Sequence, residues 1–173
     1  MAVYKDYLKA NPDTYDDPFL TGPVSEAEAL AIEEYQSMFT RIKEGEEYFD
    51  LSSPLNCMLS FYSACRYGDS AQIRRIQAKY EIKAERLPGY AEWLEEIYLW
   101  RVPAPPEKPE PGQIWPIYMK NKKNHQWEDT FLFQYWKGEW KRWGNMGGPF
   151  YDWRDSSLRM QKDFLVKKIQ SIE

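Results

Sequence analysis

Few residues of this chain have the types and spacing that catalysis needs. It has one histidine, His125, in a polar stretch that contains lysines and indicates a turn. A Ser-His-Asp or Cys-His arrangement would have to use this side chain, and its neighbours in the sequence do not support one. A glycoside-processing site would need carboxylates among aromatic rings, and the C-terminal half has them at Glu128, Asp129, Glu139, Asp152 and Asp155. A solvated β surface has the same composition, so the sequence favours a protein that is not an enzyme.

Metal and cofactor sites are not indicated either. Cys57 and Cys65 lie in one expected helix, about 12 Å apart along its axis, which is too far for a disulfide between them. Together with a single histidine they lack the ligand spacing of a zinc site. Gly144, Gly147 and Gly148 do not form a phosphate-binding pattern between a strand and a helix. We therefore expect no metal, no cofactor and two buried thiols.

The stretch TFLFQYWKGEWKRW, residues 130–143, is the most aromatic part of the chain. Two bulky runs flank Lys137-Gly138, which predicts a β-hairpin with these two residues as its turn. The turn fixes the cross-strand pairs as Tyr135 with Trp140, Phe133 with Arg142, Gln134 with Lys141 and Leu132 with Trp143. The first two pairs share one face of the sheet, and the last two share the other.

This hairpin has three interpretations. Its rings are core, or they stack single-stranded nucleic acid or a glycan beside nearby lysines, or they form a protein-binding patch with an arginine. The two binding interpretations share the candidate residues Trp136, Lys137, Trp140, Lys141, Arg142 and Trp143. The net charge of −4 and the absence of an RNA-binding motif favour a protein partner over nucleic acid.

The first third of the chain offers a second candidate surface, because it is acidic. Residues 1–60 hold four Lys/Arg against twelve Asp/Glu, whereas residues 113–173 hold eleven against seven. A negative surface there would suit a basic partner protein, and its candidate residues are Asp13, Asp16, Asp17, Glu33 and Glu34. Two other interpretations stay open: an ordinary solvated helix face, and attraction between the two halves of the chain.

Four helices are expected in the first part of the chain, over residues 26–44, 54–67, 70–80 and 90–101. A capping box from Ser25 to Glu28 opens the first, and Ser53-Pro54 opens the second. The second helix is apolar nearly all round, which predicts a central position. Its small polar stripe, Asn56, Ser60 and Ser63, either lines a pocket or lets another backbone segment approach closely.

The later part of the chain predicts a small antiparallel sheet. Residues 113–119 read as a strand at an edge or with a bulge, because Pro116 cannot donate to a ladder. Residues 120–125 read as a turn, the hairpin supplies two more strands, and 155–172 has helical periodicity. The expected α+β fold is therefore an N-terminal lobe of four helices followed by a sheet of three or more strands packed on a C-terminal helix.

This gives four segments: an extended arm (1–24), the helical lobe (25–101), a proline-rich connector (102–112), and the sheet with its helix (113–173). The chain has no apolar run of transmembrane length and no signal-peptide pattern, so we expect a cytoplasmic protein that does not enter a membrane. The expected function is a non-catalytic protein-interaction factor, namely an inhibitor, immunity or accessory protein. The alternative is binding of single-stranded nucleic acid or a glycan through residues 130–143.

Overall fold

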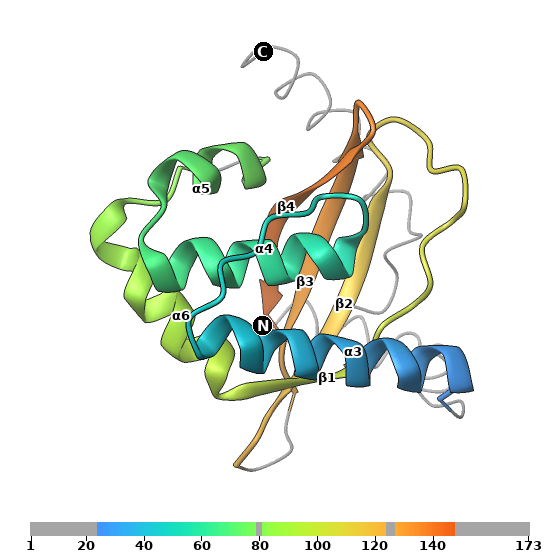
Figure 1. The fold of residues 1–173 in the computed structure, drawn as a ribbon. Helices are drawn as coiled ribbons and strands as arrows, with labels where there is room; N and C mark the ends of the chain where they lie inside the picture. The colour runs from blue at the N-terminus through green and yellow to red at the C-terminus, as the bar shows by residue number, and fades with distance from the viewer. Residues whose placement is uncertain (1–23, 79–80, 124–126, 148–173) are drawn as a thin grey trace.

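The structure is a computed structural model, and it describes residues 24–78, 81–123 and 127–147. Over these ranges the fold is mixed α+β, with four α-helices, one 3-10 turn and a four-stranded antiparallel sheet (Figure 1). The helical elements are α3 (Glu26–Lys43), α4 (Pro54–Tyr67), α5 (Ser70–Ile76), η2 (Ala84–Arg86) and α6 (Leu87–Glu95). The strands are β1 (Ile97–Arg101), β2 (Ile114–Asn121), β3 (Trp127–Trp136) and β4 (Glu139–Gly147).

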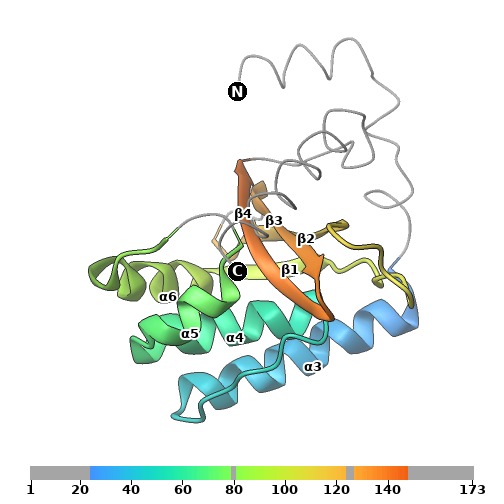
Figure 2. The same ribbon diagram turned by 90° about the horizontal axis from the view of Figure 1, so that it is seen from above.

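The helices form a layer against one face of the sheet, as Figure 2 shows. Within that layer α4 is central, because it contacts α3, α5 and α6 as well as β2 and β4. Its burial matches its sequence, since all residues from Cys57 to Cys65 are buried. The predicted central position of this apolar helix is therefore confirmed. One hydrophobic core contains residues from all four α-helices and from each of the four strands.

Local signals set the ends of α4. The Ser53 side chain accepts a hydrogen bond from the Asn56 backbone N–H at 3.0 Å, and Pro54 occupies the first turn, where its missing N–H costs nothing. Gly68 ends the helix in the left-handed region, with φ 66°. These are the boundaries that the sequence predicted.

The small polar stripe on α4 binds a neighbouring backbone segment. Ser63 Oγ accepts from the Tyr48 N–H at 2.9 Å, and Ser60 Oγ accepts from the Asp50 N–H at 2.7 Å. The segment that returns from α3 to α4 therefore lies directly on α4. Close approach of another backbone is therefore shown for Ser60 and Ser63, whereas Asn56 lines a hollow that is described below.

Two predicted helices end earlier than expected. The helix predicted over 90–101 is wrong in its second half, because α6 ends at Glu95 and Ile97–Arg101 forms β1. Burial alternates along this strand, and a short aromatic and β-branched run fits a strand period as well as a helical one. The helix predicted over 70–80 ends at Ile76, where Gln77 turns extended and the Ala78 N–H donates to Arg142 O on β4 at 2.8 Å.

The sheet has the order β1-β2-β3-β4, so the proline-rich connector joins two neighbouring strands of one sheet. We call this connector, residues 102–112, the strap. Strand β2 lies between β1 and β3 in that order, where a proline usually removes a ladder hydrogen bond because it has no N–H. Pro116 does not remove one. The β1 pairing reaches only as far as Tyr118, so beyond it β2 has β3 as its one neighbour among the described strands. A missing N–H on the open side therefore removes no ladder bond.

The predicted hairpin turn is confirmed. Lys137 and Gly138 have φ values of 48° and 81°, as expected for a turn that follows the twist of the strands. Three of the predicted pairs are present: Tyr135–Trp140, Gln134–Lys141 and Phe133–Arg142. The fourth is wrong, because Leu132 pairs with Gly144 and Trp143 is the extra residue of a bulge.

The hairpin places Trp140 and Arg142 in the core. Trp140 has only 2% of its surface exposed and Arg142 only 4%. The Arg142 guanidinium lies over three rings, 4.3 Å from the centre of Phe61, 4.7 Å from Phe131 and 5.6 Å from Tyr90. Ring faces stabilise a buried cation electrostatically. The guanidinium also donates to side-chain oxygens, at 2.8 Å to Gln77 and 2.6 Å to Asn145.

Two parts of the sequence prediction lie outside the described residues. These are the arm, apart from Val24, and the helix expected over 155–172.

The burial of the hairpin predicts which of its side chains the fold needs. We expect Trp140→Ala and Arg142→Ala each to lower the free energy of unfolding by about 3 kcal/mol or more, since one leaves a large cavity and the other empties the aromatic cage. Lys141→Ala, between them in sequence and only half-buried, should change it by less than about 1 kcal/mol. Urea denaturation measures all three variants. Equal, small losses would show that these two residues are not core supports.

Candidate functional site

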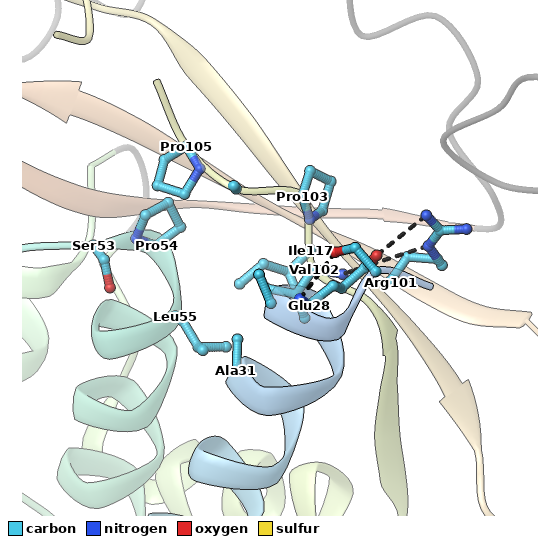
Figure 3. Close-up of a pocket in the computed structure, with 13 residues that line it drawn as sticks. Glu28, Ala31, Ser53, Pro54, Leu55, Arg101, Val102, Pro103, Pro105 and Ile117 are labelled. Atoms are coloured by element: carbon cyan, nitrogen blue, oxygen red, sulfur yellow. Dashed lines mark hydrogen bonds and ion pairs between the residues drawn. The ribbon is translucent and has the colours of Figure 1, made fainter. Parts of the chain in front are cut away.

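An apolar hollow of about 390 Å³ opens between the first turns of α3, the first turns of α4 and the strap (Figure 3). Its wall consists mainly of apolar side chains, among them Ala27, Ala31, Pro54, Leu55, Pro103 and Pro105. Ile117 of β2 also lines it. We call this cavity the proline hollow.

A buried ion pair holds one side of this hollow. Glu28 of α3 accepts from Arg101 Nε at 3.0 Å and from Arg101 Nη2 at 3.2 Å. The same carboxylate accepts from the Val102 backbone N–H at 2.7 Å. The two side chains are 10% and 8% exposed, so this contact is nearly dry. It fixes the start of the strap to α3.

The sequence predicted a capping box from Ser25 to Glu28, and the structure shows its backbone hydrogen bond but a different partner for the Glu28 side chain. Ser25 Oγ accepts from the Glu28 N–H at 3.1 Å, as a capping box requires. The Glu28 side chain, however, reaches Arg101 on β1, which is 73 positions further along the chain. No local pattern in the sequence reveals such a partner.

An exposed leucine stands beside the proline hollow. Leu30 is 55% exposed and lies on α3 between Ala27 and Ala31, both of which line the hollow. Three exposed glutamates surround it at helical spacings of four and three residues, namely Glu26, Glu33 and Glu34. Val24, just before the helix, is 45% exposed. This part of α3 is thus an apolar surface with an acidic border.

The predicted acidic surface is described only in part. Glu33 and Glu34 are exposed on α3, whereas Asp13, Asp16 and Asp17 lie outside the described residues. The sequence singled out Glu33 and Glu34 by their charge and did not single out Leu30. The signal was Leu30, a large apolar residue on the outer face of an otherwise polar helix surface.

The aromatic-basic hairpin is not a surface of the kind that the binding interpretations need. Trp140 and Arg142 belong to the core described above, and Trp136 and Trp143 are 7% and 8% exposed. Lys137 is exposed and Lys141 is half-buried. Stacking of bases or sugars needs accessible ring faces. The burial of these four side chains therefore supports the core interpretation.

The cysteine thiols are buried and chemically quiet. Both are free, and burial raises the pKa of each thiol, that of Cys65 to about 12. A thiol with a raised pKa holds little of the nucleophilic thiolate at neutral pH. This agrees with their expected role as small apolar residues.

The carboxylates that could suggest catalysis are either engaged or outside the described part. Glu139 accepts from Arg75 at 2.7 Å on the surface. The side chains of His125, Glu128, Asp129, Asp152 and Asp155 lie outside the described residues. Within the described ranges, no three His, Cys, Asp or Glu side chains lie together as metal ligands. The helices of the same ranges include none that is long and apolar enough to cross a membrane.

Comparisons with known proteins identify no relative of this chain. No family model matches it, and no curated protein and no solved structure is significantly similar to it.

The buried ion pair predicts a measurable cost when it is broken. Glu28→Gln should lower the free energy of unfolding by about 3 kcal/mol, because Arg101 would keep a charge in a dry site without its carboxylate. Glu46→Gln is the matched control. Its carboxylate pairs with Arg41 at 2.6 Å, but the side chains are 46% and 56% exposed, so the loss should stay below about 1 kcal/mol. Equal losses in urea denaturation would show that the Glu28 pair does not hold the strap.

The raised thiol pKa values predict slow modification of the folded protein. At pH 8, Cys57 and Cys65 should react with Ellman's reagent on the order of a thousandfold more slowly than in the urea-unfolded chain, because the thiolate fraction is small and access is blocked. An added exposed thiol, Ala29→Cys on α3, should react at once and calibrate the assay. Rapid reaction of all thiols in the native chain would contradict the burial of the pair.

Proposed function

We propose that this chain is a non-catalytic protein-interaction factor that acts as an inhibitor, immunity or accessory protein. It binds a partner protein through the α3 face, which we define as Leu30, the surrounding Glu26, Glu33 and Glu34, and the adjoining proline hollow. The observation that carries the proposal is the exposed Leu30 at the edge of an apolar hollow, within a ring of carboxylates.

The α3 face has the composition of an interface. The centre of a protein interface is depleted of charge, whereas its rim is polar and hydrated. Burying the exposed 55% of Leu30 contributes about 1–1.5 kcal/mol, and a neighbouring hollow lets a partner side chain interlock with it. The carboxylate rim adds long-range attraction for a basic partner, which raises the rate of association.

A catalytic role for the hollow lacks the necessary groups. Its charged residues among those described are Glu28 and Arg101, and these bind each other and the Val102 backbone. The remainder of the wall is apolar except for Ser25 and Ser53, whose hydroxyls cap α3 and α4. General acid–base catalysis needs a titrating group in reach of a substrate, and this pair is committed to holding the strap.

Binding of nucleic acid or a glycan through the hairpin finds less support. The burial of Trp140, Trp143 and Arg142 removes the rings and the cation that such a site would use. The exposed charges on the described α3 face are negative, which repels a phosphate backbone. We place the protein in the cytoplasm, since free buried thiols suit a reducing compartment.

The proposal predicts that binding depends on Leu30. A partner is first captured from nuclease-treated lysate of the host, purified, and titrated against each variant. Leu30→Asp should weaken its binding by tenfold or more, about 1.4 kcal/mol, because an apolar contact is replaced by a charge. Ala29→Asp is the control, since it adds the same charge at the next position, about 100° around the helix.

Two results would contradict the α3 face. In one, the partner binds Leu30→Asp as tightly as it binds the wild type. In the other, nuclease removes all captured proteins and the chain shifts labelled oligonucleotides in a salt-sensitive way, which would support the nucleic-acid alternative.

A further inference from the structure

A second hollow continues the α3 face toward the C-terminal end of the helix. It has a volume of about 360 Å³ and lies between α3, α4 and the segment that returns between them. Its lining is more polar than that of the proline hollow, with Glu34, Arg41, Tyr48 and Asn56 on its wall. We call it the polar hollow. Leu55 of α4 lines both hollows and is their common boundary.

One stripe of α3 runs along both hollows. Ala27 and Ala31 line the proline hollow, and Glu34, Met38 and Arg41 line the polar hollow. Their spacing of four, three, four and three residues places all five on one side of the helix. The stripe is about 21 Å long, since a helix rises about 1.5 Å per residue. The two hollows therefore lie one after the other along α3, with Leu55 between them, and we call them together the α3 groove.

The charges along this groove favour one kind of occupant. Arg41 is already bound by Glu46, with contacts of 2.6 and 2.7 Å, so its charge is compensated. Glu34 forms no ion pair with any residue that the structure describes, and its carboxylate is exposed on the groove wall. Residues 24–50 as a whole carry eight acidic and two basic side chains. A segment that binds here gains from positive charge.

We propose that this groove takes a linear basic segment of the partner protein. An apolar side chain of that segment fills the proline hollow, between the strap and Ala31. A lysine or arginine further along the segment meets Glu34 at the entrance of the polar hollow. About six or seven extended residues cover the length of the stripe, at about 3.3 Å per residue. This inference rests on the proposed function and specifies the form and chemistry of the partner.

The two ends of the groove contribute differently. The proline hollow supplies the apolar contact, which gives most of the affinity because it removes side chains from water. Glu34 supplies direction, because a segment bound in reverse would place its basic residue against the strap. An ion pair at this exposed site contributes about 1 kcal/mol or less, so its removal should weaken binding without abolishing it.

The test is selection of random twelve-residue peptides on the full chain, followed by anisotropy titration of the enriched peptides. We expect enriched sequences with one large apolar residue and at least one lysine or arginine within the following seven positions. Ala31→Trp fills the proline hollow and should weaken these peptides by tenfold or more. Glu34→Lys should weaken them about threefold to fivefold and remove most of the salt dependence.

Glu92→Lys is the matched control for charge, because Glu92 is exposed on α6 and lies outside both hollows. Its titrations should agree with the wild type within twofold. Thermal melting checks each variant. Should Ala31→Trp fail to fold, Glu34→Lys alone decides the outcome, because it replaces an exposed side chain and leaves the apolar wall intact.

Three results would overturn the groove. They are enrichment of acidic or uncharged peptides, affinities that neither variant changes, and no enrichment at all. A wild-type dimer that both variants convert to monomers would also overturn it, because the occupant would then be a second copy of this chain. The proposed function is judged separately, by the effect of Leu30→Asp on the natural partner, so a folded partner surface on α3 can survive the loss of the linear segment.

Discussion

The fold depends on how it accommodates one buried cation. Arg142 enters the core from β4 and lies against rings of α4, α6 and β3, while its N–H groups reach the Gln77 and Asn145 side chains. A guanidinium in such a place loses its water, so the ring faces and amide oxygens must replace that water in a fixed geometry. These contacts hold α4, α6 and the segment after α5 against the sheet. This requirement explains why Arg142 and most aromatic rings of the hairpin 130–143 are buried and not exposed.

Much of the fold could be predicted because its signals are local. Ser25, Ser53 and Gly68 mark helix ends through hydrogen bonds and backbone angles that involve only their neighbours. The Lys137-Gly138 turn fixed three strand pairs in the same way. The strand at Ile97–Arg101 was missed because its five residues are too few to separate a period of two from one of 3.6. What decides its state is the pairing with β2, which lies beyond the proline strap.

The candidate site was predictable at its rim and not at its centre. The exposure of Glu33 and Glu34 could be predicted from their charge and their position in the helix, because charged side chains on a helix usually face water. The proline hollow does not, since its walls come from α3, α4, the strap and β2. The hairpin shows the opposite error. Trp140 and Arg142 are residue types common in binding patches, but the same aromatic and cationic contacts can be satisfied within one chain.

The contact between Glu28 and Arg101 has a consequence for the order of folding. It joins residues 73 positions apart, so closing it costs more chain entropy than forming α3 or the hairpin. We expect it to form late, after the sheet and α4 are in place. The proline hollow is complete only then, because the strap is one of its walls. A partner that recognises this hollow would ignore nascent and partly unfolded chains, and its binding would act as a check on the finished protein.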